Sequence, residues 1–411
     1  MHTTINISDK TKYYLDLEEQ YSAHNYHPLP VVLSKGKGVF VWDVDGKRYY
    51  DFLSGYSALN QGHCHPAIIT AFIEQAQQLT LTSRAFHSDA FGEYARFITQ
   101  FFGYDKVLPM NAGVEAVETA IKLCRRWGYD KKGIPANKAT IIVCEHNFHG
   151  RTSTVISFST DPSSYTGFGP YTPGFTIIPY NDLPALAEAL KDPNVAGFLV
   201  EPIQGEAGVV VPDEGYLSTA KKYCDAANVL FIADEIQTGL ARTGRMLACD
   251  HEGVRPDILI LGKALSGGTM PVSAVLADDP VMLTIKPGEH GSTYGGNPLA
   301  CRVAMASLQV LQDEKMAENA AAMGALFRKE LAALGSPHIA TIRGKGLLNA
   351  IVINHPDPNA AWNLCLTMKE LGLLAKPTHG DKIRLAPPLV ITEEQIRESV
   401  KIIGKALETL Q

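Results

Sequence analysis

The chain has 411 residues, of which 45% are hydrophobic and 19% are charged, and its formal net charge is −6. This length and composition are typical of a water-soluble globular protein with one large and one smaller domain. The negative charge and the lack of a basic cluster argue against a nucleic-acid partner, and no apolar run approaches the ~20 residues that cross a bilayer.

The first residues and the cysteines predict where the protein is located. MHTTINISDKTKYYLDLEEQ contains acidic residues and no apolar core, so we expect neither a signal peptide nor a transit peptide. The seven cysteines are scattered and never form C-x-x-C, which is typical of reduced thiols rather than of disulfides or a zinc site. We therefore predict a cytoplasmic protein.

In chain order, the first predicted elements are an irregular arm and a hairpin within residues 1–50. The hairpin is GVFVWDVDGKRYYDFL, with Asp45-Gly46 as its turn. From about residue 105 to residue 270, apolar runs alternate with amphipathic helical patterns; the runs are KVLPM, ATIIVC, AGFLVEP, VLFIADE and DILILG. This alternation predicts βαβ units, with helices on both faces of a mainly parallel sheet.

The carboxyl-terminal part of the chain has a different pattern. TIRGKGLLNAIVIN and KIRLAPPLVI predict strands, with a helix around 359–371 between them. Thr392 and Gln395 form a capping box that begins a closing helix. We expect an α/β fold in which a cleft between the domains is the active site. The predicted parts are the arm and hairpin at 1–50, which join the small domain, a large cofactor-binding domain at 51–303 and a carboxyl-terminal small α+β domain at 304–411.

Polar side chains follow three of the predicted strands. Glu201 and Glu206 follow FLV, Asp234 and Gln237 follow LFIA, and Lys263 follows ILILG. Ligands of parallel sheets bind beyond the carboxyl ends of the strands, so we expect these side chains to meet. A strand-end lysine alone is more often a solvated charge, but Asp234 follows a buried run and needs a partner there.

These residue types match the needs of one cofactor, pyridoxal phosphate. A lysine can form a Schiff base with it, and a carboxylate such as Asp234 can hold its pyridine nitrogen protonated. Asn111, Ala112 and Gly113 open a long predicted helix, whose N-terminal N–H groups can bind phosphate, although any helix needs a cap. A P-loop is excluded because Asp257 replaces its first glycine, and no G-x-G-x-x-G follows a strand.

Other candidate groups have simpler explanations. HCHP at 63–66 offers too few clustered ligands for zinc, and His146 and His149 lack an H-E-x-x-H pattern, so we expect no metal site. Arg242 and Arg245 are expected to form structural pairs.

Several longer motifs carry a family resemblance. PIQGEAG, FIADEIQTGLARTGR, ILILGKALSGG and GSTYGGNPLACR occur in this order, and nearly the whole chain resembles the class III, fold-type I pyridoxal-phosphate aminotransferases. FLSGYSALNQGHCHP, LTLTSRAF, NFHGRT, STDPSSYTGFGP and LLAKPTHGDKIRLAPPLVI narrow the resemblance to members that act on ornithine. One residue departs from the pattern: His146 stands before NFHGRT where a smaller residue is expected.

The resemblance implies a reaction. The δ-amino group of L-ornithine passes to 2-oxoglutarate, giving glutamate and glutamate 5-semialdehyde, which cyclises to pyrroline-5-carboxylate. This reaction belongs to arginine metabolism and proline biosynthesis.

The resemblance also implies the residues around the cofactor ring. Lys263 forms the Schiff base and shuttles the proton, Asp234 pairs with the pyridinium nitrogen, and Gln237 reaches the ring hydroxyl. Phe148 stacks on one face of the ring, and Ile236 packs beneath the other.

The phosphate site implies a second subunit. Gly113 and Val114 give backbone N–H groups to the phosphate, while Ser292 and Thr293 reach it from the neighbouring subunit. A homodimer with shared active sites follows from this resemblance.

The remaining implied residues bind substrate. Tyr26 and Arg151 hold the α-amino and α-carboxylate groups of ornithine, and Tyr56 lines the same pocket. Arg384 binds the α-carboxylate of glutamate or 2-oxoglutarate, and Glu206 covers Arg384 when ornithine is bound, because an unpaired buried guanidinium is costly.

Three alternatives stay open at this point. The chain could be another class III ω-aminotransferase, of the acetylornithine or 4-aminobutyrate type, or a pyridoxal-phosphate aminomutase or racemase, which needs no second substrate. It could also be a non-catalytic protein that keeps only the fold, although Lys263, Asp234 and the phosphate turn together argue against that.

Overall fold

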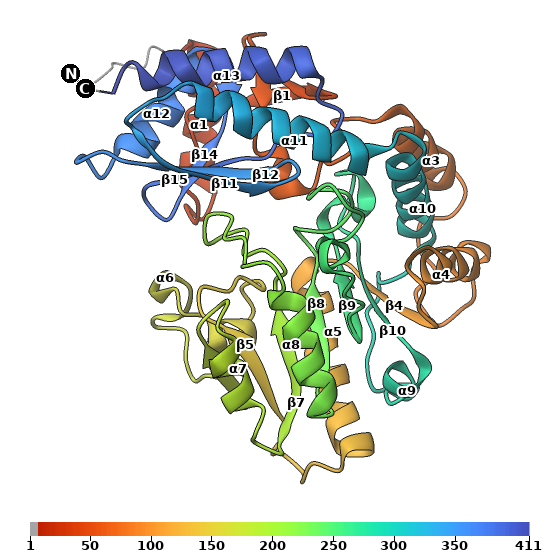
Figure 1. The fold of residues 1–411 in the computed structure, drawn as a ribbon. Helices are drawn as coiled ribbons and strands as arrows, with labels where there is room; N and C mark the ends of the chain where they lie inside the picture. Colours follow the sequence, from red (N-terminus) through yellow and green to blue (C-terminus); the bar gives the residue numbers. More distant parts are fainter. Residues whose placement is uncertain (1–6, 411) are drawn as a thin grey trace.

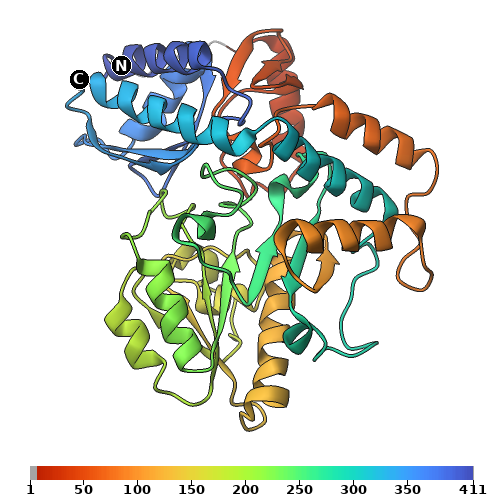
Figure 2. The same ribbon diagram turned by 45° about the vertical axis from the view of Figure 1, so that its right-hand side comes forward.

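The computed structural model describes residues 7–410, and Figure 1 shows them as two bodies of sheet and helix. The lower body contains the strands of a seven-stranded sheet, and the upper body contains the strands of two four-stranded sheets. Figure 2 shows the first of these, in red and orange, beside the blue carboxyl-terminal helices.

The first four-stranded sheet contains the predicted hairpin. Its order is β1-β2-β3-β13, and its strands are β1 (Leu33–Lys37), β2 (Phe40–Asp43), β3 (Arg48–Asp51) and β13 (Leu373–Leu374). β2 and β3 pair antiparallel around the turn at Asp45-Gly46, where Gly46 has a φ of 87° and the Asp43 carboxylate accepts the N–H of Asp45 at 3.0 Å. The predicted hairpin is confirmed.

The predicted arm is not entirely irregular, because it contains helix α1 (Asp9–Tyr21). Ser8 caps this helix by accepting the N–H of Thr11, and Thr11 is its one buried residue. With no apolar stripe facing a core, the helix has no periodic signal in the sequence.

The large sheet has the order β4-β10-β9-β8-β7-β5-β6. Its strands are β4 (Lys106–Met110), β5 (Thr140–Cys144), β6 (Phe175–Ile178), β7 (Val195–Val200), β8 (Leu230–Asp234), β9 (Ile258–Leu261) and β10 (Ser273–Ala277). The strands from β5 to β9 pair in parallel, and β10 pairs antiparallel with β9 and β4. All five predicted runs are strands, so the mainly parallel sheet is confirmed; β6 and β10 were not predicted.

Helices cover both faces of this sheet, as predicted. The longer ones near it are α3 (Pro66–Ala76), α4 (Asp89–Phe102), α5 (Gly113–Trp127), α7 (Leu183–Ala189), α8 (Tyr216–Ala226) and α10 (Pro298–Asp313). In β9, Leu259 and Leu261 belong to the core that contains α4 and α10, whereas Ile258 and Ile260 pack into the core of α5. The apolar face of α5 is buried and includes Val117, Ala120, Ile121 and Cys124.

Short helical segments connect these elements. They are α2 (Ser54–Ser57), α6 (Pro162–Tyr165), α9 (Asp279–Met282), a π-helical turn (Gly128–Lys132) and three 3-10 turns (Val155–Phe158, Ala248–Glu252, Lys263–Ser266).

The carboxyl-terminal sheet has the order β11-β12-β15-β14 and is antiparallel. It comprises β11 (Ile339–Lys345), β12 (Leu348–Ile353), β14 (Lys376–Thr378) and β15 (Lys382–Leu385), with helices α11 (Met316–Ala333), α12 (Ala360–Glu370) and α13 (Glu393–Leu407). The predicted capping box is present, because Thr392 and Gln395 each accept the other's backbone N–H. TIRGKGLLNAIVIN is a hairpin rather than one strand.

None of the helices between residues 7 and 410 combines the length and apolar character needed to cross a membrane. We keep the division of the chain at residues 50/51 and 303/304 as a proposal; the second boundary lies inside α10, which is continuous there.

Candidate active site

The predicted polar strand ends meet in one pocket of about 190 Å³. β8 ends at Asp234, Glu201 follows β7, and Lys263 follows β9 after a single glycine. The three strands are parallel neighbours, so their carboxyl ends lie at the same edge of the sheet. The other lining residues include Gly113, Val114, Phe148, Ile236, Gln237 and Glu206.

Lys263 is held at this edge by its backbone. Its φ is 43°, in the left-handed region, and a side chain on the preceding Gly262 would lie 3.2 Å from Ile236. Its Nζ donates no hydrogen bond to the residues that the structure describes. Desolvation lowers the pKa of Lys263, against the opposing charges of Glu206 and Asp234. The lysine is thus an amine that loses its proton more readily than an exposed lysine does.

Asp234 has a buried histidine as its partner. Its Oδ2 lies 2.7 Å from Nδ1 of His149, and the two side chains are 5% and 1% exposed. Burial acts to lower the pKa of His149, but the hydrogen bond and charge of Asp234 and the charge of Glu201 raise it overall. His149 therefore keeps its proton to a higher pH than a free imidazole does, and in that form it pairs with the buried Asp234 carboxylate.

The sequence prediction missed this role of His149, which was considered only as a metal ligand. The available signal was Asp234 itself, a buried carboxylate in need of a partner. His146, the departure from the motif pattern, has a φ of 59°, which explains why a smaller residue is expected there.

Glu201 supports the same corner of the pocket. Its carboxylate accepts the backbone N–H of Phe148 at 2.9 Å and so fixes the position of Phe148, which lines the pocket. Burial raises the pKa of Glu201 to about 7, although the charge of His149 acts to lower it.

The pocket fits pyridoxal phosphate. The first N–H groups of α5, at Gly113 and Val114, have no carbonyl within the helix to bind, and they open toward the pocket as a phosphate site. The Oε1 of Gln237 and the Nε2 of His149 are buried without a hydrogen-bond partner in residues 7–410. An amine, a carboxylate and a helix N-terminus thus surround one space, with Phe148 and Ile236 in its walls.

Arg384 and Glu206 form a second charged centre beside Lys263. The Arg384 guanidinium donates to Oε1 of Glu206, and the side chains are 6% and 21% exposed. Gln237 donates to the same oxygen at 3.2 Å. Burial acts to raise the pKa of Glu206, but the charges of Arg384 and Lys263 lower it overall, so the Glu206 carboxylate is ionised at neutral pH.

The other predicted substrate residues lie near this pair. The Arg384 guanidinium carbon is 5.1 Å from the ring centroid of Tyr56, and that of Arg151 is 5.8 Å from the ring of Phe148. Burial raises the pKa of Tyr56, and the charge of Arg384 acts to lower it. Tyr26 is 66% exposed in the single chain.

The two residues expected from a neighbouring subunit lie at the start of α5 in their own chain. Asn111 donates to the hydroxyl of Ser292 at 2.8 Å, and Thr293 is exposed. Their contact with another subunit's phosphate stays a prediction.

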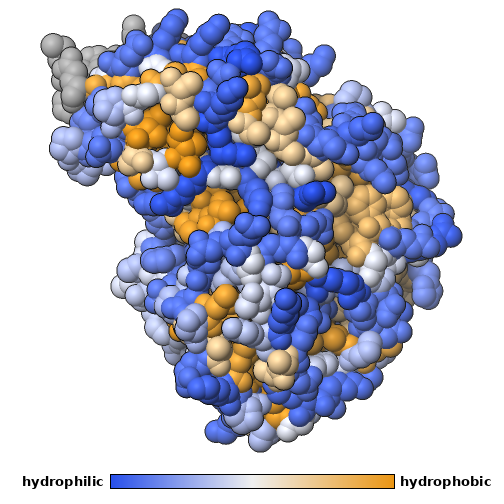
Figure 3. Space-filling view, in the orientation of Figure 1, coloured by the Kyte–Doolittle hydropathy of each residue, from blue (hydrophilic) through white to orange (hydrophobic). Residues whose placement is uncertain are grey.

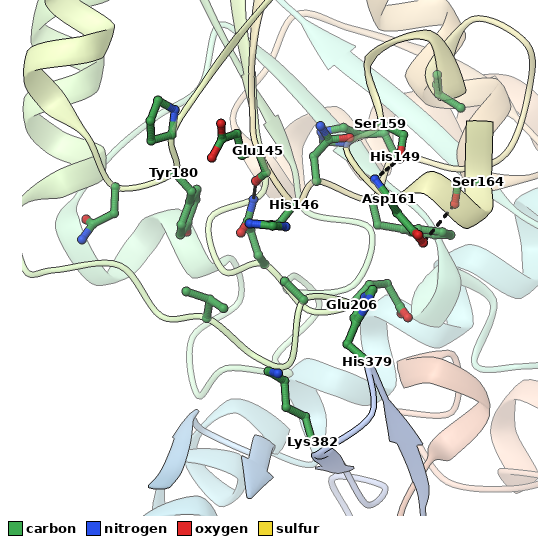
Figure 4. A pocket seen from close by; sticks show the side chains of 18 of the residues that line it. Glu145, His146, His149, Ser159, Asp161, Ser164, Tyr180, Glu206, His379 and Lys382 are labelled. Carbon is green, nitrogen blue, oxygen red and sulfur yellow. Dashed lines mark hydrogen bonds between the residues drawn. The ribbon is translucent and has the colours of Figure 1, made fainter. Parts of the chain in front are cut away.

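A wider cavity of about 600 Å³ adjoins the inner pocket and shares Phe148, His149 and Glu206 with it. Figure 4 shows His379 and Lys382 approaching it from the side opposite to Glu145 and Tyr180. His379 and Lys382 belong to the β14–β15 hairpin, so the cavity is the predicted cleft between the large sheet and the carboxyl-terminal sheet.

The remaining candidates are structural. His63 lies 2.8 Å from Asp51, and His65 lies 2.8 Å from Glu314. Within residues 7–410, no group of three or more His, Cys, Asp or Glu is placed to hold a metal. The buried Arg242 donates to Asn60 and to the carbonyls of Leu347 and Pro387, as expected of a structural arginine; Arg245 is exposed.

Residues 21–407 match the family described as "Aminotransferase class-III". The rat protein named ornithine aminotransferase, mitochondrial, is 64% identical over 397 residues, which cover 97% of this chain and 90% of that protein. The Emericella nidulans protein named ornithine aminotransferase is 56% identical over 415 residues, covering 98% of this chain and 91% of that protein.

Solved structures agree in fold. The ornithine aminotransferase of Toxoplasma gondii superposes with a TM-score of 0.95 at 52% identity, covering 97% of this chain and 95% of that one. The acetylornithine aminotransferase of Elizabethkingia anophelis has a TM-score of 0.89 at 60% identity, covering 97% of this chain and 99% of that one.

Proposed function

The chain belongs to the class III aminotransferase family, and from this premise we propose that it transfers the δ-amino group of L-ornithine to 2-oxoglutarate. The products are glutamate and glutamate 5-semialdehyde, which cyclises to pyrroline-5-carboxylate. The chain is a pyridoxal-phosphate-dependent transaminase, as its family and the buried amine, carboxylate and helix N-terminus of the pocket indicate.

The residues of the inner pocket divide the work of binding and proton transfer. When bound, pyridoxal phosphate supplies an electron sink for the electron pair released at the substrate carbon. Gly113 and Val114 would bind its phosphate, and Asp234, paired with His149, would hold its ring nitrogen protonated. Lys263 would hold the cofactor covalently and move the proton at the substrate carbon, a role that suits its lowered pKa.

The ion pair of Glu206 and Arg384 is the observation that carries the choice of amine. Ornithine brings its δ-amino group to Lys263 without a carboxylate beside it, so Glu206 keeps Arg384 satisfied. A carboxylate of 2-oxoglutarate replaces Glu206 on Arg384, because arginine binds carboxylates through a planar fork. We call Glu206 the gate carboxylate.

Three residues would contact the part of ornithine that lies away from Lys263. Tyr26 and Arg151 would bind its α-amino and α-carboxylate groups, and Tyr56 would line the space between them and Arg384. The Arg384 guanidinium, 5.1 Å from the Tyr56 ring, supports the role of Tyr56, and the roles of Tyr26 and Arg151 follow from the family resemblance.

We also propose a homodimer with shared active sites. Phe86 and Tyr294 are 75% and 58% exposed in the single chain, and Thr293 beside Tyr294 is exposed as well. On the face shown in Figure 3, apolar side chains gather in separate patches amid a mostly polar surface. Dilution is expected to release cofactor as the subunits separate, whereas a cofactor-saturated, active monomer in sedimentation would contradict the shared site.

The cytoplasmic location stays a proposal. The names of the rat and Drosophila relatives include "mitochondrial", and that of the Emericella nidulans relative does not.

An acetylornithine-type activity is the second candidate, because the Elizabethkingia anophelis relative with that name is 60% identical. The two substrates differ in the α-amino group, and only the product of free ornithine can cyclise through it. The test incubates the holoenzyme and 2-oxoglutarate with ornithine or N-acetylornithine, measuring glutamate and trapped pyrroline-5-carboxylate. We expect glutamate and the trapped product from ornithine; turnover of N-acetylornithine alone would favour the second candidate.

A further inference from the structure

The gate carboxylate stands on a tightly held loop, residues 204–210, which we call the gate loop. Its two ends pair, with the N–H of Gln204 on the carbonyl of Val210 at 3.1 Å and the reverse bond at 2.9 Å. Val209, near its end, has a φ of 56° and is fully buried. A β-branched residue adopts this backbone conformation only where its surroundings hold it there.

The carboxyl-terminal sheet provides those surroundings. Val209 packs in a small apolar cluster with Ile203, which follows β7 of the large sheet. The other members belong to the body that contains the carboxyl-terminal sheet and are Leu348, Ala350 and Ala386. The gate loop is therefore clamped between the two bodies that border the cavity.

The β14–β15 hairpin makes a second set of contacts. The hydroxyl of Thr378 donates to the backbone carbonyl of Glu206 at 3.0 Å. Lys382, paired with Thr378 across the hairpin, crosses Gly208, where an added Cβ would lie 2.4 Å from the lysine Cδ. Arg384 on the same hairpin binds the Glu206 side chain. In Figure 4, Glu206 lies next to His379 and above Lys382.

We propose that Thr378 is a positioning residue that sets the amine selectivity of the enzyme through the backbone of Glu206. Its hydroxyl fixes the gate residue's main chain on the hairpin that carries Arg384. The carboxylate then reaches or leaves the guanidinium by side-chain rotation alone. This inference rests on the proposed function, because it concerns the closed gate that ornithine requires.

Removing the Thr378 hydroxyl should make the closed gate less stable, because more of the backbone must then be ordered when the gate closes. Without the hydroxyl, the backbone at Glu206 loses one of the contacts that hold it, so closing the gate also requires ordering that stretch of backbone, which has an entropic cost. The closed state becomes less populated, so the ornithine half-reaction loses rate while the glutamate half-reaction, which needs the gate open, does not. One neutral hydrogen bond corresponds to a change of about three- to tenfold in the ratio of the two.

The test compares Thr378→Val, which keeps the shape and removes the hydroxyl, with Thr378→Ser, which keeps the hydroxyl. Thr367→Val is the matched control, because the Thr367 hydroxyl also binds a carbonyl, that of Asn363, but lies on α12 away from the gate. Two quantities are measured on each holoenzyme: amide hydrogen exchange in residues 204–210, and kcat/KM of each half-reaction by stopped-flow. Thr378→Ala serves as a second hydroxyl-free variant if the valine does not fold.

We expect Thr378→Val to speed exchange in the gate loop and to lower the ornithine-to-glutamate ratio of kcat/KM by about three- to tenfold, with Thr378→Ser and Thr367→Val like the parent. Unchanged exchange and ratio in Thr378→Val, equal losses in both half-reactions, or the same shift in Thr367→Val would each overturn the proposal. If the parent enzyme makes no pyrroline-5-carboxylate, the proposed function fails, while the exchange data still decide whether Thr378 holds the loop.

Discussion

Glu206 and Arg384 lie 178 positions apart in the chain, yet their side chains form an ion pair beside Lys263. The arginine is 6% exposed, so its charge is nearly removed from water and depends on a partner. One partner comes from the gate loop and the other arrives with the substrate, and this exchange is the basis of the proposed selectivity.

Removing the gate carboxylate separates the two half-reactions. In Glu206→Ala, Arg384 is left unpaired when ornithine binds, and we expect the ornithine kcat/KM to fall about tenfold to a hundredfold, the cost of losing a hydrogen bond to a charged group. The glutamate half-reaction should keep or gain rate, since its carboxylate no longer displaces Glu206. Stopped-flow of each half-reaction measures the ratio, with Glu145→Gln in the same cavity as control. Equal losses would mean that Glu206 is only structural.

Lys263 is expected to be the residue that holds the cofactor covalently. Its lowered pKa makes the neutral amine available at a lower pH than in an exposed lysine. Borohydride reduction of the loaded enzyme, followed by peptide mapping, should place the cofactor on the peptide that contains Lys263. Lys382, which lines the outer cavity, is the internal control. Cofactor on Lys382 or on any other lysine would refute the assignment.

Neutralising Asp234 should separate binding from turnover. In Asp234→Asn the phosphate site and Lys263 remain, so cofactor should still bind, but its ring nitrogen loses the charge that holds it protonated. We expect kcat to fall by about a hundredfold or more, as when a preorganised charge at a reacting centre is lost. Asp257→Asn is the control. Asp257 lies just before the start of β9, away from the pocket, and its carboxylate accepts the N–H of Phe231. Full kcat in a loaded Asp234→Asn enzyme would exclude the electron-sink role.

The titration of Glu201 should make the free energy of unfolding of the cofactor-free protein depend on pH. Burial raises its pKa from 4.5 to about 7, so the folded protein binds this proton more tightly than the unfolded chain does. The contribution of this proton to the free energy of unfolding is greatest below the pKa of the unfolded chain and is lost as the pH rises through about 7. Glu201→Gln cannot titrate but can still accept the Phe148 N–H, so it should gain stability relative to the parent over that range.

Urea unfolding at a series of pH values measures this difference. The exposed Glu145→Gln should follow the parent at every pH. A constant offset between Glu201→Gln and the parent would show that burial does not shift this carboxyl.

The sequence predicted the parts of the site that lie on single strands. The runs before Asp234 and Lys263 are buried on both faces of the sheet, so they are continuously apolar and their ends are clear. By contrast, β10 is antiparallel and contains small residues, among them Ser273 and Ala274, which give no comparable signal.

Contacts between distant segments were not predictable from pattern alone. His149 and Asp234 are 85 positions apart, and nothing in NFHGRT indicates which side chain will face the end of β8. The roles of Arg384 and Glu206 came from family resemblance, because periodicity places Arg384 on a strand but cannot select its partner. The hydroxyl of Thr378 on the Glu206 carbonyl is a contact to a backbone atom and leaves no trace in the sequence.

The central claim is that this pocket moves the δ-amino group and not the α-amino group of ornithine. The most direct measurement incubates the holoenzyme with 2-oxoglutarate and ornithine labelled with ¹⁵N at the δ position, and follows the label by mass spectrometry. We expect labelled glutamate and an unlabelled pyrroline-5-carboxylate, because the gate pairs Arg384 while the δ-amine lies at Lys263. Unlabelled glutamate, with the label kept in the cyclised product, would show α-amino transfer and contradict the account.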